Sequence, residues 1–235
     1  MAFNVDANGI LQPLGVTVLR DNRMDLLPGT RDYFESIPGR DGEFDFGCDL
    51  EGQILELHCV VETTRATWYT LRNTIAGYLN PKLGTQDLTF ADEPGVVYRV
   101  RYSGSIPLTL YPFAREFTIP FKMCNPHRLA STQSALTGAG TAVNAGNDET
   151  PCVVEIVGPV TNPSVTIGGK VMTYTGQVTA SDKLIIDTEK LTATFNGANA
   201  LVNYNGVFPG LAVGDNAVTA ASAGTTTVKW TNRFI

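Results

Sequence analysis

Two histidines are the residues of this 235-residue chain that could most readily serve as a catalytic base. His58 follows Glu56 at a spacing of two within an alternating apolar segment, and His127 lies in the turn-like run Asn125–Arg128. Neither is accompanied by the Gly-x-Ser-x-Gly turn that carries the nucleophile of a serine hydrolase. We therefore expect both histidines to be structural or surface residues, and we predict no catalytic residue.

The four cysteines, Cys48, Cys59, Cys124 and Cys152, contain no Cys-x-x-Cys pair. This spacing disfavours a zinc site and thioredoxin-type redox chemistry. Three of the four lie in or beside segments that are typical of strands, where cysteine is ordinarily a buried, unpaired thiol. We predict buried free thiols there and no cofactor.

Acidic and aromatic residues alternate in the segment 37–47, IPGRDGEFDFG. Its acids have the one-three-five spacing of a calcium loop, but Phe46 stands where an EF-hand requires glycine and no glutamate follows at the twelfth position. No metal is predicted. Because a turn this charged is exposed while its phenylalanines need burial, we predict an arm that contacts a neighbouring subunit. The contact residues predicted for this arm are Arg40, Asp41, Glu43, Phe44, Asp45 and Phe46.

The composition predicts a folded, mainly β protein. There are 23 glycines and 13 prolines, and many of them separate short apolar runs, as in all-β proteins with many turns. A net charge of −6 disfavours binding to a phosphate backbone, which needs clustered Lys and Arg. No apolar run approaches the roughly 18 residues of a membrane helix. The first residues, MAFNVDANG, lack a signal-peptide pattern, which predicts folding in a cytoplasm.

One helix is predicted, over residues 63–80. Trp68, Leu71 and Ile75 recur at three- and four-residue steps and define one apolar face. Thr63 or Thr64 can cap its start, and Pro81 disfavours its continuation. Elsewhere alternation with a period of two predicts half-buried strands. These strands are predicted near residues 16–19, 53–61, 96–102, 117–123, 153–157, 165–167, 171–174, 184–187, 191–195, 216–220 and 225–230.

A shift in composition divides the chain into two predicted domains. After Arg128 the sequence becomes rich in Ala, Ser, Thr, Gly and Asn. We predict an N-terminal domain over 1–128, a linker over 129–137 and a C-terminal domain over 138–235. The turns of the second half recur at intervals near ten residues, which is typical of a β-sandwich.

Several segments together resemble the siphophage distal tail proteins, the Dit family. In the first half the resemblance lies in IPGRDGEFDFG, in the helix after the next strand and in FTIPFKMCNPHR at 117–128. In the second half it lies in NAGNDETPCVVEIVGPVTNPSVTIGG at 144–169, LIIDTEKLTATFNG at 184–197, and the short motifs at 206–211 and 214–216. The resemblance covers nearly the whole chain.

The resemblance implies a mainly β fold, with an N-terminal β-sandwich or barrel-like domain related to tail tubes, carrying one α-helix, and a C-terminal galectin-like β-sandwich. It implies a structural hub of the virion tail tip, made in the host cytoplasm, rather than an enzyme. Six copies would form a ring that joins the tail tube protein to the tail-tip or tail-associated protein. DNA would pass through its lumen without specific binding, and receptor-binding proteins could dock on its outer domains.

A second interpretation stays open from the residues alone. A monomeric β-sandwich module that binds cell-wall carbohydrate would share the same strand pattern and composition. Fold does not carry function, and Trp230, the only tryptophan of the second half, is expected in the core of the last strand rather than in a sugar site. The two interpretations differ in oligomeric state, because the first requires a hexamer and the second a monomer.

Overall fold

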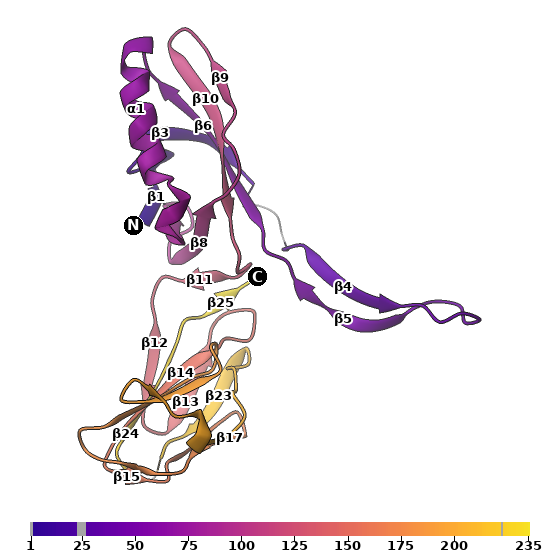
Figure 1. Cartoon of the computed structure of the whole chain (residues 1–235), viewed down its shortest axis with the longest axis vertical. Coiled ribbons are helices and arrows are strands. Elements are labelled where there is room, and N and C mark those ends of the chain that lie inside the picture. The colour runs from indigo at the N-terminus through magenta and orange to yellow at the C-terminus, as the bar shows by residue number, and fades with distance from the viewer. Residues whose placement is uncertain (1, 23–26, 222) are drawn as a thin grey trace. The chain divides into compact units, whose positions relative to one another are not determined.

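The computed structural model describes residues 2–22, 27–221 and 223–235. The chain divides into two compact units, one formed by the residues up to Arg128 together with Ile235, and the other by Leu129–Phe234. Both are built mainly of strands (Figure 1), as the sequence predicts. Each unit has its own hydrophobic core.

A seven-stranded barrel forms the body of the first unit. Its strands run in the order β8-β7-β1-β2-β3-β6-β10, and a further pairing of β8 with β10 closes the ring, while β9 adds to β10. Strands β1 and β7 are parallel. Their bounds are β1 (Ala2–Val5), β2 (Ile10–Gln12), β3 (Val16–Asp21), β6 (Ile54–Glu62), β7 (Gln86–Phe90), β8 (Val96–Tyr102), β9 (Leu108–Leu110) and β10 (Ala114–Lys122).

The predicted alternation accounts for the longest pair of strands. In β6 every second side chain from Leu55 to Val61 is buried, and Leu57 and Cys59 are fully buried. These residues lie opposite Ile119 and Phe117 of β10, whose side chains are buried in the same core. Alternation places the polar members of both strands on the other face of the sheet. The period of two therefore identifies both the strands and their inward faces.

Helix α1 (Arg65–Tyr78) lies where the apolar stripe predicts it. The hydroxyl of Thr64 accepts a hydrogen bond from the backbone N–H of Thr67 (3.4 Å), and the Thr67 hydroxyl accepts one from the backbone N–H of Thr64 (3.2 Å). This reciprocal pair is a capping box, which satisfies two donors at the helix start. The short helix η1 (Pro81–Leu83) follows. Ile75 and Leu79 are buried against the barrel, with Trp68, Leu71 and Tyr78 half-buried beside them.

The second unit is a β-sandwich of two sheets over one core. One sheet has the order β12-β24-β14-β19-β20-β21 and the other β13-β23-β16-β17-β22. The first sheet consists of β12 (Ser134–Thr137), β14 (Cys152–Val157), β19 (Lys183–Asp187), β20 (Thr192–Phe195), β21 (Ala198–Asn199) and β24 (Thr225–Trp230). The second consists of β13 (Gly140–Asn144), β16 (Ser164–Ile167), β17 (Lys170–Tyr174), β22 (Tyr204–Gly206) and β23 (Gly214–Thr219). Strand β11 (Arg128–Ala130) begins at the last residue of the first unit, and the remaining short elements of the second unit are β15 (Val160–Thr161), β18 (Gln177–Val178), η2 (Leu201–Asn203) and β25 (Arg233–Phe234).

The segment predicted as a linker, 129–137, differs from that prediction. Residues 134–137 form strand β12, which pairs antiparallel with β24 from Ser134 opposite Trp230 to Thr137 opposite Thr227. Leu136 packs against the core of the sandwich. The small polar residues of this segment resemble a linker in composition, but their pairing with a strand about 90 residues further along the chain makes them part of the sheet. Trp230 is buried, as predicted.

Candidate functional site

The two histidines, which are the side chains that could most readily act as a base, have hydrogen-bond partners. The Nδ1 atom of His58, on β6, lies 2.8 Å from the hydroxyl of Thr118 on the neighbouring strand β10. The Nδ1 atom of His127 lies 2.7 Å from the Oδ1 atom of Asn125 within one turn. Both histidines therefore have hydrogen-bond partners within the first unit, and that neither is catalytic stays a prediction.

The four cysteines are free thiols, but they divide into two environments. Cys59 and Cys152 are buried, and burial raises the pKa of the Cys59 thiol to about 12 and that of Cys152 to about 11, because a thiolate loses its hydration there. Cys48 and Cys124 are exposed. The prediction that a cysteine in or beside a strand is buried is therefore wrong for Cys124, which follows the buried Met123 just after the end of β10.

The part of the chain that the structure describes brings together no group of three or more His, Cys, Asp or Glu side chains that could hold a metal ion. None of the helices there is long and apolar enough to cross a membrane.

The acidic and aromatic segment lies in an exposed hairpin, which we call the arm (residues 30–50). The arm consists of β4 (Thr30–Glu35) and β5 (Phe44–Leu50), which form a two-stranded sheet of their own (Figure 1). All six residues of β4 are exposed, and so are all but the two terminal residues of β5. The arm therefore adds nothing to either core, and its stability depends on local contacts.

The two strands of the arm are fixed in register by a bulge. Asp32 lies opposite Cys48 and Phe34 opposite Asp45, so that β5 has one more residue than β4 between these pairs. Gly47 occupies this extra position with φ of +92°, a conformation that glycine adopts without strain. Its backbone N–H donates to the Oδ1 atom of Asp45 at 2.7 Å. Gly47 thus has a structural role in the hairpin.

Polar contacts stabilise the arm along its length. Near its base the hydroxyl of Tyr33 donates to the Oδ2 atom of Asp49 at 2.7 Å, and this bond raises the pKa of Tyr33. Near its tip the guanidinium of Arg40 lies 4.0 Å from the centroid of the Phe44 ring, within the range of a cation–π contact. Together with the strand pairing, these contacts stabilise the conformation of the arm up to its tip.

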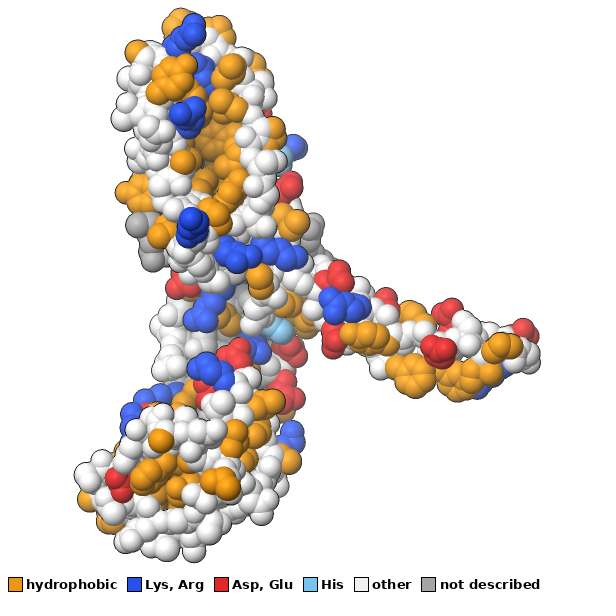
Figure 2. Space-filling view, in the orientation of Figure 1, with side chains coloured by type: hydrophobic (Ala, Val, Ile, Leu, Met, Phe, Trp, Pro, Cys, Tyr) orange, Lys and Arg blue, Asp and Glu red, His pale blue; other side chains and the backbone are white. Residues whose placement is uncertain are grey.

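The arm exposes an unusual amount of apolar surface. Four large side chains on it are at least two-fifths exposed, namely Tyr33 (42%), Phe34 (53%), Ile37 (49%) and Phe46 (70%). Figure 2 shows hydrophobic side chains gathered along one side of the arm, with acidic residues between them. Exposed apolar surface of this kind marks an interaction site.

The structure places the six predicted contact residues together at the tip of the arm. Arg40, Asp41 and Glu43 lie in the connecting turn, and Phe44, Asp45 and Phe46 begin β5. Strand β4 is not among the predicted strands, because its sequence, TRDYFE, is mostly polar and does not alternate with a period of two. The sequence signal for β4 is the aromatic pair Tyr33-Phe34, because this pair and the aromatic residues Phe44 and Phe46 lie on the two sides of a glycine-rich turn, as expected for a hairpin.

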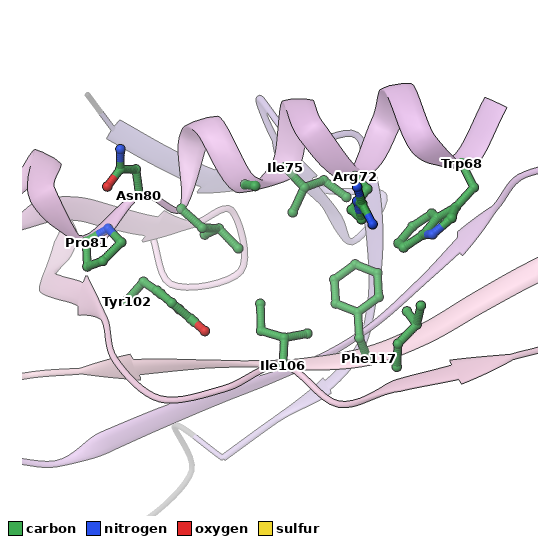
Figure 3. Close-up of a pocket in the computed structure, with 11 residues that line it drawn as sticks. Trp68, Arg72, Ile75, Asn80, Pro81, Tyr102, Ile106 and Phe117 are labelled. Atoms are coloured by element: carbon green, nitrogen blue, oxygen red, sulfur yellow. The ribbon is translucent and has the colours of Figure 1, made fainter.

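A second exposed feature is an apolar groove of about 520 Å³ between helix α1 and the strands β9 and β10 (Figure 3). Trp68, Arg72 and Ile75 extend from the helix toward Ile106 and Phe117 on the opposite wall. The remaining lining residues are Ala76, Leu79, Asn80, Pro81, Tyr102 and Leu108. A groove of this volume lies within the range of specific binding sites.

Comparison with known proteins identifies the family. Residues 11–123 match the family model of the phage tail protein RIFT-related domain, and residues 145–234 match that of the siphovirus-type tail component, C-terminal domain. The chain belongs to the siphophage distal tail protein family. The resemblance seen in the sequence is thereby confirmed.

A solved structure shares the fold of this chain. The crystal structure of the SPP1 Dit protein matches with a TM-score of 0.79 at 14% identity, over 94% of this chain and 94% of that one. Two structures of the phage p2 baseplate in its activated conformation, with Sr and with Ca, match with TM-scores of 0.44 and 0.39 at 7% identity, over 91% of this chain and 90% of theirs. Among curated proteins, no sequence matches. The SPP1 match confirms the predicted fold class, a mainly β chain with β domains at both ends.

Proposed function

We propose that this distal tail protein is a ring-forming hub at the tip of a siphophage tail. Six copies close a ring through their N-terminal barrels, and the arm of each copy contacts the next. The observation that carries the proposal is the arm, whose aromatic and acidic residues are left uncovered by their own chain. A head-to-tail contact between different surfaces generates a ring when its rotation closes.

The fold supports this proposal. The structure with the same fold is described as that of a hub adsorption apparatus in phages that infect Gram-positive bacteria. By analogy, the ring joins the tail tube protein on one side to the tail-tip protein on the other, and the C-terminal sandwiches hold the adsorption apparatus, including receptor-binding proteins. DNA passes through the lumen unbound, which agrees with a net charge of −6. The protein acts as a structural part of the virion and not as an enzyme.

The carbohydrate-binding alternative has weaker support. Sugar-binding sites commonly present an open aromatic face, but Trp230 is only 6% exposed. Its indole N–H donates to the backbone carbonyl of Val143 at 3.2 Å and to the Oδ1 atom of Asn232 at 3.1 Å. This side chain holds the end of β24 in place, which is a structural role.

Light scattering on the full chain tests the ring. The expected mass is six times the 25.3 kDa of one chain, and rings should be visible by negative-stain microscopy. Deletion of Arg40–Asp45 should leave both units folded, by circular dichroism, and reduce the mass to that of a monomer. Val202→Asp provides the control, because Val202 is exposed in the second unit and takes no part in the arm.

The outcomes separate the two functions. A chain that stays monomeric over the whole concentration range, and that binds cell-wall polysaccharide, would contradict the hub and favour the carbohydrate-binding module. A deletion variant that still forms hexamers would leave the hub intact and show that the arm is not its contact.

A further inference from the structure

We propose that the apolar groove between helix α1 and strands β9 and β10 receives the arm tip of a second copy of this chain. This inference rests on the proposed ring and specifies the surface through which neighbouring copies bind. The projecting arm tip and the concave groove both expose apolar side chains, and they carry opposite net charges. Each is left open by its own chain, since the tip residue Phe46 is 70% exposed and the groove has an unfilled volume of about 520 Å³.

The groove continues into a wider apolar surface. Leu108, Leu110 and Phe113, at or next to the β9 wall, are 38%, 66% and 78% exposed. Of the residues of α1, only Ile75 is buried, so most of the helix surface is accessible. In Figure 2 the hydrophobic side chains fill a hollow over this region, and Lys and Arg residues lie beside it. A surface of this kind needs an apolar partner.

Charge identifies the partner. The helix and the turn after it, residues 65–83, contain three cations, Arg65, Arg72 and Lys82, and no acid, which gives +3. The arm, residues 30–50, contains six acids and two arginines, which gives −4 of the chain's total of −6. Surfaces of opposite sign steer two copies together and disfavour wrong orientations. The arm tip is the strongly acidic and aromatic segment that such a groove fits.

A buried cation lies next to the groove. Arg115, on the inner face of β10, is 6% exposed, and its guanidinium lies 5.8 Å from the centroid of the Trp68 ring. One of its terminal nitrogens donates to the backbone carbonyls of Tyr111 and Ala114. Its Nε atom has no hydrogen-bond partner among the described residues. This buried positive charge adds to the attraction of an acidic segment at the Trp68 end of the groove.

A pair of substitutions on one helix tests the groove. Ala76 is exposed and lines it, so Ala76→Glu introduces both bulk and a charge of the same sign as the arm. Asn73→Glu makes the same change in charge on the same helix at an exposed position outside the groove lining, and serves as the control. We expect Ala76→Glu to raise the concentration at which rings half-form by at least about tenfold, and Asn73→Glu to change it far less. Circular dichroism and the thermal melt of the first unit verify that both variants are folded.

Photo-crosslinking locates the contact directly. With p-benzoylphenylalanine in place of Phe46, the assembled protein should crosslink to residues 65–83 or 103–117 of another copy, as read by mass spectrometry of a mixture of heavy- and light-isotope chains. Crosslinks elsewhere, together with equal assembly of the two glutamate variants, would show that the groove is not the contact for the arm tip, and would leave the proposed ring intact. A wild-type chain that never assembles would overturn the ring itself, and the inference with it.

Discussion

Replacing Leu57 by alanine should destabilise the N-terminal unit alone. Leu57 is fully buried on β6 and faces the barrel core. Truncating a leucine in such a site costs about 3–5 kcal/mol, because the lost transfer free energy is joined by that of the cavity. The first unit comprises the residues up to Arg128, and an unfolding entropy of about 2.1 cal/mol/K per residue then gives about 0.27 kcal/mol/K. The melting temperature of this unit should fall by about 10–20 °C.

The two tryptophans provide the assay, since Trp68 lies in the first unit and Trp230 in the second. Thermal melts in the Trp230→Phe background report on the first unit, and melts in the Trp68→Phe background report on the second. Leu57→Ala should shift the Trp68 transition and leave the Trp230 transition in place, because the two cores share no residue. All melts are made at one protein concentration, since association changes apparent stability.

Leu19→Ala is the matched control, because Leu19 lies in the same unit but is 58% exposed. Its cost should stay within about 0.5 kcal/mol, or about 2 °C. If Leu57→Ala moved both transitions together, the chain would unfold as one cooperative body, and the description of two independent cores would be refuted. A shift no larger than that of Leu19→Ala would show that Leu57 is not in a packed core.

Three further predictions concern local chemistry. Thr64→Ala removes the capping box of α1 and should lower the free energy of unfolding of the first unit, measured from the Trp68 transition, by about 1 kcal/mol. The control is Thr70→Ala, at an exposed position of the same helix, which should be neutral or slightly stabilising. Equal losses in the two variants would show that the cap does not stabilise the helix. In the native protein at neutral to mildly alkaline pH, iodoacetamide should label Cys48 and Cys124 but not Cys59 or Cys152, whose thiols are buried and whose raised pKa values disfavour the thiolate; mass spectrometry that finds labelled Cys59 without denaturant would contradict this. Lys183 and Lys229, at 2.6 and 2.9 Å, lower the pKa of Glu155 below its ordinary 4.5. Because the folded-state pKa is lower than the unfolded-state pKa, Glu155 contributes stability above about pH 4.5, and this stability is lost as the pH falls through the lowered value. Glu155→Gln should therefore flatten the acid-induced fall of the Trp230 melting temperature. An unchanged pH profile would show that the ion pairs of Glu155 do not stabilise the fold.

Much of the fold follows from the sequence, because its signals are local. Inward positions of β6 and β10 recur every second residue, and the apolar positions of α1 every third or fourth, so burial can be inferred along one segment at a time. The capping threonine and the proline after Asn80 delimit the helix in the same way. The motifs of 37–47 and of the second half also carry the family resemblance without any structure.

What the tertiary structure alone decided are the pairings between distant segments. No local pattern in the sequence shows that β8 pairs with β10 and closes the barrel. The residues of β12, 134–137, likewise have no periodicity that predicts their pairing with β24, about 90 residues further along the chain. Exposure of Cys124 and of the whole of β4 likewise depends on which neighbours are present, not on the residues themselves. The groove beside α1 exists only because strands β9 and β10 lie opposite that helix. Local sequence patterns therefore identify the side chains that favour burial, whereas the fold determines which of them remain exposed for a partner, because burial depends on non-local packing.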